Sequence, residues 1–315
     1  MTPVKTQPAT GFAKEILETF DALNHGPHAG YRPAHAKGLL VTGRFTPSSK
    51  AASLTRAPHV QHSSTPVTVR FSNTTGLPAI ADTDANASPR GMAVRFHLAE
   101  HVHTDIIAHS VNGFPARNAE EFLELLRAIA ATGPEAAHPT PIEAFLGTHP
   151  AALAYVQAPK PVPASFFRES FYAVNAHRFT NAEGVSRYGR YRIRPEGGNE
   201  YLDAATVAQQ TPDFLFDDLR ERLARGPVKM HVAVQVAAHG DIVNDATMQW
   251  PDNRPEVAFG TIEAMNVLQN NDEEQRHIIF DPIPRVDGIE PSDDPLLEPR
   301  AAVYLMSGRR RRAAR

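Results

Sequence analysis

The sequence predicts an α+β fold built on an antiparallel sheet or barrel. Most predicted strands are short β-branched or alternating runs that follow one another with only turn residues between them. Amphipathic helices interrupt these runs in blocks and do not alternate regularly with single strands, which is typical of α+β rather than parallel α/β proteins. The chain of 315 residues shows no internal repeat and is long enough for a large core. We therefore expect one domain.

The first half of the chain supplies one helix and four strands. Five apolar side chains recur at helical spacing over residues 11–24, and a loop rich in Gly, Pro and His follows. The predicted strands cover 38–45, 65–73, 91–98 and 103–111. Because these four runs are separated by turn residues, they favour antiparallel pairing.

The second half adds two strong helices and further strands. Amphipathic patterns predict helices at 118–132 and 211–226, and the proline-rich stretch 134–165 predicts short helical pieces that wrap around the domain. The turn sequence NAEGV separates two strands of a hairpin, 170–180 and 186–195, and a long strand is predicted at 228–240.

Composition excludes several classes of function. The net charge of −3 and the pI near 6.6 argue against general nucleic-acid binding. The absence of cysteine excludes disulfides, iron–sulfur clusters, thiolate-bound haem and cysteine-based zinc sites. The first residues contain no apolar secretion signal, and no apolar run approaches membrane-spanning length. We expect a cytoplasmic protein.

The C-terminal sequence RAAVYLMSGRRRRAAR is a local anomaly on this nearly neutral background. Five of its last seven residues are arginine, a pattern usually interpreted as a nucleic-acid or targeting patch. Arg300 and Tyr304 are four residues apart, so a helix would place them on one face. Taken alone, this pair is equally consistent with a solvated helix surface.

Three further residues have an ordinary explanation when each is taken alone. His35, in RPAHAKG, fits a turn histidine, and most of the 15 histidines fit surface or core positions. Arg70 and Ser72 flank Phe71 in VRFSN, which fits an exposed strand. Only their combination with the C-terminal segment indicates a site.

In combination, these segments resemble the haem catalase superfamily, and specifically its catalase-related peroxidases. The similarity runs in order from about residue 11 to the end of the chain. The matching segments are RPAHAKG, VRFSN, SPRGMAVRFHLAEHVHTDIIAHSV, HRFTNAEGVSRYGRYRIRP, NDATMQWP and NDEEQRHIIFDPIPRVDGIEPSDDPLLEPRAAVY. A lone HAKG is weak evidence, but six ordered motifs ending in R-x-x-x-Y are specific.

The resemblance implies an eight-stranded antiparallel barrel with surrounding helices. It implies a single catalase-core domain over residues 1–315, with flexible ends at about 1–10 and 313–315. The C-terminal helical or flavodoxin-like domain of large catalases and their long N-terminal arm are expected to be absent.

The resemblance also implies haem b with ferric iron and assigns the central residues. Tyr304 would bind the iron as a phenolate, which tyrosine does in catalases. Because a free tyrosine has a pKa of about 10, Arg300 would help to keep Tyr304 ionised. His35 would be the distal acid–base catalyst, and Ser72 would fix its tautomer through the other ring nitrogen.

Arginines are implied to neutralise the haem propionates. Arg32 and Arg70 occupy the positions of two such arginines, and Arg311 aligns with a third. Arg309 or Arg312 could take the role of Arg311, because four arginines stand in a row there.

One position departs from the family pattern. Catalases carry a distal asparagine at the end of the strand that corresponds to DIIAHSVNGF. Counting from Asp105 places that position at Ser110, directly after His109, while Asn112 would need a shifted backbone to replace it. Phe114 falls in register with a distal phenylalanine. Losing the asparagine should weaken positioning of a second peroxide, so we expect peroxidase activity to exceed dismutation.

The expected partners are a peroxide, either hydrogen peroxide or an organic hydroperoxide, and a small organic electron donor. Nucleic acid and membrane are not expected as partners, and a homo-oligomer such as a dimer is one option.

Two alternative functions remain open. The same haem site could isomerise or dehydrate a lipid hydroperoxide without a donor, or the arginine tail could serve a non-catalytic haem-binding or nucleic-acid-binding module.

Overall fold

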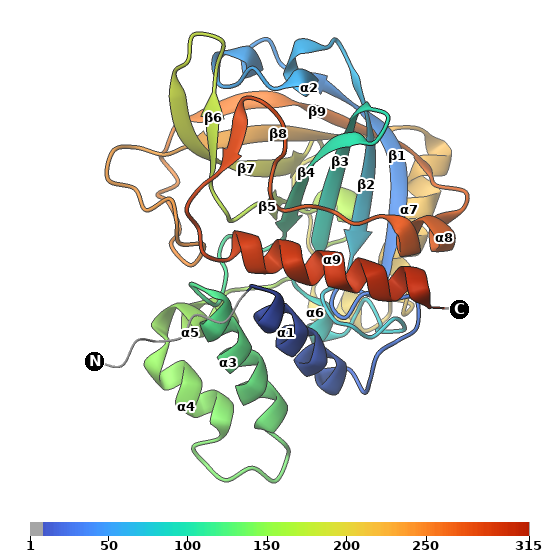
Figure 1. Cartoon of the computed structure of the whole chain (residues 1–315). Helices are drawn as coiled ribbons and strands as arrows, with labels where there is room; N and C mark the ends of the chain where they lie inside the picture. Colours follow the sequence, from blue (N-terminus) through green and yellow to red (C-terminus); the bar gives the residue numbers. More distant parts are fainter. Residues whose placement is uncertain (1–8, 315) are drawn as a thin grey trace.

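A computed structural model describes residues 9–314, and within them eight antiparallel strands close into a barrel (Figure 1). The neighbour order is β1-β2-β3-β4-β5-β7-β8-β9, and β9 pairs with β1 to close the circle. The bounds are β1 (Gly38–Pro47), β2 (Thr65–Ser72), β3 (Gly91–Ala99), β4 (Val102–His109), β5 (Phe171–Tyr172), β7 (Ser186–Pro195), β8 (Val228–Val236) and β9 (Glu256–Val267). This confirms the expected eight-stranded antiparallel barrel.

Alternation along the strands fills the barrel with apolar side chains. In β2, Val67, Val69 and Phe71 are buried in the main core, whereas Arg70 and Ser72 take the other parity. Aromatic rings from several strands meet inside the barrel and contact one another edge to face. The outer faces of the strands are therefore the surfaces that remain for the helices and for a site.

A hairpin and a short strand extend one edge of the barrel. β6 (His177–Thr180) pairs with the start of β7 across the NAEGV turn, as expected from the sequence, and β10 (Ile289–Pro291) pairs with β6. The segment after β10 leads directly into α9 (Leu297–Ala313). The chain thereby enters its last helix close to the barrel.

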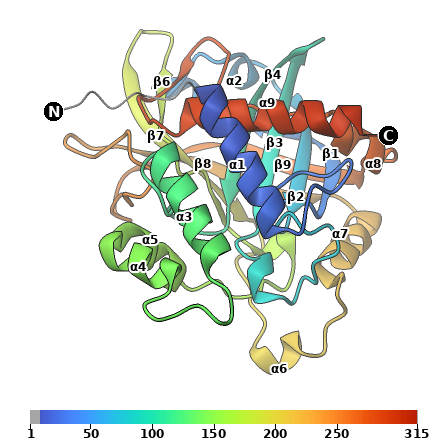
Figure 2. The same cartoon turned by 60° about the horizontal axis from the view of Figure 1, so that its bottom comes forward.

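Helix α9 lies between the barrel and a layer of helices formed by α1, α3, α4 and α5 (Figure 1). These are α1 (Ala9–Leu23), α3 (Ala119–Ala131), α4 (Pro141–Thr148) and α5 (Pro150–Gln157). α1 crosses over α9 (Figure 2), and Ile16, Leu123 and Leu126 form an apolar cluster against which Val303 packs. The amphipathic faces of α1 and α3 are thus used to cover α9.

The remaining helices are short or flank the barrel. They are α2 (Pro58–Gln61), α6 (Ala204–Val207), α7 (Phe214–Arg225) and α8 (Asn271–His277). Single 3₁₀ turns cover Ala51–Ser53, Ala85–Ala87 and Phe166–Arg168. No helix in the described part of the chain is both long and apolar enough to cross a bilayer.

Helices lie at both ends of the described part of the chain. α1 begins at Ala9, earlier than expected, and residues 1–8 lie outside the described part of the chain. At the other end α9 continues through Ala313, because the arginines that follow Tyr304 bind backbone carbonyls near α8. The expectation of flexible ends at about 1–10 and 313–315 stays a prediction, and Arg315 lies outside the described residues.

Candidate cofactor cavity between the barrel and helix α9

A cavity lies between the outer face of β2, β3 and β4 and the helices α9, α1 and α3. Its volume is about 230 Å³, measured as the space open to the centres of water-sized spheres. Eight candidate side chains line this one cavity, although they span 280 positions of the chain: Arg32, His35, Arg70, Ser72, Phe114, Arg300, Tyr304 and Arg311. Arg309 and Arg312, the alternatives to Arg311, do not line it as far as the structure describes the chain. The barrel wall and α9 bring them together.

His35 enters the cavity from a loop that runs beside β2. Its backbone is left-handed, with φ of 57°, a conformation that costs a residue with a side chain about 1–3 kcal/mol. The His35 N–H donates to the carbonyl of Thr74 at 2.9 Å, and the next N–H, of Ala36, donates to Thr75 at 2.8 Å. The surroundings therefore hold His35 in a strained conformation.

Ser72 and Gly91 fix the orientation of the His35 ring. The ring Nδ1 lies 3.1 Å from Ser72 Oγ, within hydrogen-bonding distance. A Cβ on Gly91 would lie 2.5 Å from that Oγ and 2.8 Å from Nδ1, so only glycine leaves room for the pair. With Nδ1 engaged, Nε2 is the nitrogen that remains for chemistry.

His35 is held in its neutral form. Burial, followed by the nearby Arg70 guanidinium, lowers the pKa of His35 to about 4, while the Asn73 backbone acts in the opposite direction. A neutral imidazole can accept a proton near pH 7. This is the protonation state that an acid–base catalyst needs before it meets a protic substrate.

Three arginines meet at one end of the cavity without an acidic partner. Arg32, Arg70 and Arg311 form no ion pair with any carboxylate among residues 9–314, and they donate instead to carbonyl, amide and hydroxyl oxygens. Burial and mutual repulsion lower the pKa of Arg70 to about 9 and that of Arg32 well below its ordinary value. Arg70 and Arg311 are buried and Arg32 is half-buried, and three such uncompensated cations favour binding of an anionic group.

Helix α8 orients this arginine group. Gln275 Oε1 accepts from Arg70 Nε at 2.9 Å, and the Gln275 carbonyl accepts from Arg311 Nε at 3.3 Å. The carbonyl of Ile278, just after α8, accepts from Arg32 at 3.1 Å and from Arg311 at 2.8 Å. Neutral acceptors thus hold the guanidinium groups without neutralising them.

Tyr304 and Arg300 form the other polar feature of α9. Arg300 Nη2 donates to the Tyr304 hydroxyl oxygen at 3.1 Å, across one helical turn. Arg300 Nη1 donates to Asn175 Oδ1, and the Asn175 amide donates to the buried Asp294 carboxylate at 2.7 Å. A chain of hydrogen bonds therefore fixes the cation beside the phenol.

The structure corrects the assignment at the end of β4. His109 lines the cavity, while Ser110 and Asn112 do not, as far as the described residues show. Ser110 instead binds Arg90: its N–H donates to the Arg90 carbonyl and its hydroxyl accepts from the Arg90 N–H, both at 2.9 Å. Burial, followed by the nearby His35, lowers the pKa of His109 to about 3.

The remaining lining is apolar except for Ser307. The rings of Phe114 and Phe122 have their centroids 5.2 Å apart and their planes tilted by 36°, and α1 contributes Ile16 and Phe20. Such a lining suits a large flat apolar group.

The residues present fit a haem. A phenol with an adjacent guanidinium is a donor that ferric iron accepts, and the group of three unpaired arginines matches two carboxylates on one edge of an otherwise apolar ring. Sequence reasoning missed His109, Gln275, Asn175 and Asp294. Only His109 offered a signal, since it directly precedes Ser110 and the others lie in a short helix or in loops.

Comparison with known proteins agrees with this geometry. The family model described as Catalase matches residues 16–315. The chain belongs to the catalase family. Proteins of this family use haem, and membership makes the chain an oxidoreductase.

Two similar relatives are named catalase-related peroxidase. The protein from Mycolicibacterium paratuberculosis is 36% identical, over 90% of this chain and 89% of its own length. The protein from Synechococcus elongatus is 30% identical, over 95% and 88%. A catalase of Alkalihalophilus pseudofirmus is 29% identical, but the match covers only 46% of its length.

Solved structures share the fold. Catalase A from Saccharomyces cerevisiae superposes with a TM-score of 0.78 at 22% identity, over 94% of this chain and 64% of that one. A fungal catalase gives the same TM-score over 94% and 62%. The family's barrel is therefore present in this shorter chain.

Proposed function

We propose that this protein is a haem b peroxidase that reduces hydrogen peroxide or organic hydroperoxides with a small organic electron donor, and that its dismutation of hydrogen peroxide is weak. The observation that carries the proposal is the convergence on one apolar cavity of Tyr304 with Arg300, the neutral His35 with Ser72, and the three unpaired arginines. The names of the two catalase-related peroxidases support it.

Ferric haem, when bound, supplies the metal centre at which the peroxide O–O bond is cleaved. Tyr304 would hold the iron, and Arg300 would stabilise the phenolate by donating to its oxygen. Arg32, Arg70 and Arg311 would pair with the propionates. These five residues would set the position of the group.

The proton chemistry falls to His35. Its Nε2 would accept a proton from the incoming peroxide and return it to the departing oxygen, so that water or an alcohol leaves. Ser72 keeps Nδ1 occupied and thereby keeps the ring in one orientation. The left-handed backbone of His35 is consistent with this role, since strained conformations concentrate at functional sites.

His109 supports the bias toward peroxidase turnover. Dismutation requires a second hydrogen peroxide to be oriented as a reductant. A neutral imidazole carries a single N–H donor, whereas an asparagine amide carries two. In addition, His109 Nδ1 accepts from the Val111 N–H at 3.4 Å, and its Nε2 has no partner among the described residues.

The remaining expectations stay proposals. We propose that residues 1–315 act as one catalase-core domain, located in the cytoplasm. A homodimer is compatible with the sequence.

Steady-state peroxide consumption on haem-loaded protein tests the function. With hydrogen peroxide or cumene hydroperoxide, we expect turnover to depend on an added phenolic donor and to fall strongly in His35→Ala. Oxygen release without a donor should be slow. Donor-independent, rapid oxygen release would contradict the proposal and indicate an efficient catalase.

The apolar wall favours one alternative on the same site. The aromatic side chains of α3 and the preceding loop would accommodate an acyl chain, as needed by a lipid-hydroperoxide isomerase or dehydratase. Products from a fatty-acid hydroperoxide separate the two. A reduced alcohol formed at the expense of the donor supports the peroxidase, and an epoxide or rearranged product formed without a donor supports the alternative.

A further inference from the structure

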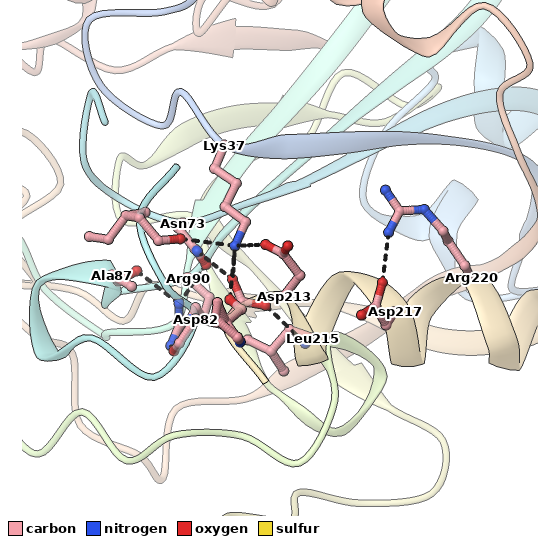
Figure 3. Close-up of polar contacts among 11 residues, drawn as sticks. Lys37, Asn73, Asp82, Ala87, Arg90, Asp213, Leu215, Asp217 and Arg220 are labelled. Atoms are coloured by element: carbon pink, nitrogen blue, oxygen red, sulfur yellow. Dashed lines mark hydrogen bonds and ion pairs between the residues drawn. The ribbon is translucent and has the colours of Figure 1, made fainter. Parts of the chain in front are cut away.

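Figure 3 shows a buried polar cluster formed by residues outside the cavity lining. We call Lys37, Asn73, Asp82 and Arg90 the support cluster. Asp82 is at its centre and is fully buried: Oδ1 accepts from Lys37 Nζ and from Asn73 Nδ2, both at 2.8 Å, and Oδ2 accepts from the Leu215 N–H at 2.9 Å. One carboxylate therefore receives three donors from three segments of the chain.

The other members are equally constrained. Lys37 Nζ also donates to the carbonyls of Ile80 at 2.9 Å and Pro212 at 3.1 Å. Arg90, fully buried, donates to Asn73 Oδ1 and to the Asp82 carbonyl. Buried charges with this many partners are expensive to assemble, and replacing Asp82 would leave Lys37 paired with the exposed Asp213 alone.

Three of the four members lie within two positions of a cavity residue in the chain, and Asp82 bonds to two of those three through its carboxylate. Lys37 follows His35 by two positions, Asn73 follows Ser72, and the Asn73 N–H donates to the Lys37 carbonyl at 3.1 Å. Arg90 precedes Gly91, the residue that touches both His35 and Ser72. The cluster thus holds the two segments that carry the His35–Ser72 pair.

Arg90 extends the same support to β4. Its backbone N–H and carbonyl both bond to Ser110, the residue after His109. The chain segments that carry His35, Ser72 and His109 are thereby all connected to the support cluster.

We propose that the support cluster positions His35 and Ser72 for the reaction, and that Asp82 is the positioning residue on which it depends. This inference rests on the proposed function. The left-handed conformation of His35 is unfavourable and must be held by its surroundings. The Asp82 carboxylate accepts hydrogen bonds from Lys37, Asn73 and Leu215 together. An asparagine amide in its place has one oxygen and one NH₂ group, so its NH₂ would face one of these three donor groups without forming a hydrogen bond.

Asp82→Asn tests the proposal, with Asp217→Asn as the matched control. Asp217 belongs to an ion pair with Arg220 on α7 that is more than half exposed on both sides (Figure 3). Hydrogen–deuterium exchange on the purified full chain should show the His35 and Ala36 amides exchanging at least about tenfold faster in Asp82→Asn, with the amides of β8 unchanged. The control should exchange like the parent protein.

Cyanide binding to the haem-loaded protein gives a second measure, because hydrogen cyanide must give up its proton to a distal base. A ring displaced by about 1 Å can cost about 100-fold in a reaction, so we expect cyanide affinity to fall at least about tenfold in Asp82→Asn. Its effect and that of Ser72→Ala should be non-additive, because both act on His35.

Several outcomes would overturn the proposal. They are unchanged exchange at His35 and Ala36, uniformly faster exchange throughout the barrel, and additive losses with Ser72→Ala. If Asp82→Asn does not fold, Lys37→Met is judged by the same measurements. A protein that binds no haem would refute the proposed function but would leave the exchange result decisive for the cluster.

Discussion

His35 has both a strained, left-handed backbone and an environment that keeps its imidazole neutral. Its left-handed conformation is recognisable only in the structure, since the sequence RPAHAKG offers no glycine at that position. Its neutrality also depends on the fold, because burial and Arg70, which is 35 positions away, set its pKa. The sequence identified the residue but not the two properties that make it useful.

The pH dependence of turnover should reflect this environment. Because the pKa of His35 is lowered to about 4, the neutral base is fully present from pH 7 down to about 5 and is lost only as the pH falls through 4. We expect kcat/KM for peroxide to be flat over pH 5–7 and to decline below. An inflection near pH 6.5 that disappears in His35→Gln would contradict this.

His109 shows how the end of β4 differs from the sequence interpretation. Ile107, Ala108 and His109 all line the cavity, whereas Ser110 lies just after the strand and binds Arg90. Counting from Asp105 by resemblance missed the site by one residue.

Replacing His109 by asparagine should shift the balance of activities. An amide offers two donors toward a second hydrogen peroxide, so we expect oxygen release to rise several-fold relative to donor oxidation. Asn112→Ala, outside the cavity lining, is the control. Parallel oxygen-electrode and donor-oxidation assays measure the ratio, and an unchanged ratio in His109→Asn would show that this position does not select between the two reactions.

At the scale of elements, the sequence predicted most strands but missed β9, the longest strand in the described part of the chain. Its sequence EVAFGTIEAMNV places Glu, Ala, Asn and Gly, which are depleted in strands, among its β-branched residues, so propensity is weak. The structure explains the glycine: a Cβ on Gly260 would lie 2.4 Å from the Phe45 ring. Tertiary packing, rather than local preference, makes β9 a strand.

The barrel also contains a histidine with no polar partner. His59 is 1% exposed between Phe45, Phe96 and Phe259, and neither ring nitrogen forms a hydrogen bond within residues 9–314. Burial lowers the pKa of His59 to about 4. The unfolded chain, with a histidine pKa of about 6.5, therefore takes up the proton first, and stability falls as the pH drops from 6.5 toward 4.

His59→Leu should make stability less sensitive to acid. From the two pKa values, His59 alone removes about 2 kcal/mol of unfolding free energy between pH 8 and pH 5. Urea unfolding at both pH values should show a smaller loss in the variant by about that amount. An equal loss in both proteins would mean that His59 finds a partner in solution.

At the scale of the whole molecule, the barrel is a support whose outer face carries the site. Composition and periodicity alone led only to an α+β protein, because the cavity joins segments from both ends of the chain. The order of six motifs supplied what local patterns could not. The group of three arginines also depends on the whole fold, because Arg32, Arg70 and Arg311 come from a loop, β2 and α9.

Haem removal should therefore lower thermal stability through these arginines. In the haem-free protein their charges are uncompensated, and bound propionates would relieve the repulsion. We expect haem to raise Tm by several degrees, and by clearly less in Arg311→Met. Arg220→Met, on an exposed pair, should keep the full rise. An equal rise in Arg311→Met would remove Arg311 from the anion site.

The electronic and EPR spectra of haem-loaded protein test the central claim most directly, because they report the iron ligand itself. We predict a high-spin ferric tyrosinate spectrum for the parent protein, its loss in Tyr304→Phe, and its persistence in Tyr155→Phe, whose ring does not line the cavity. A parent protein that stays colourless with added haem, or a Tyr304→Phe variant with an unchanged tyrosinate spectrum, would contradict the account.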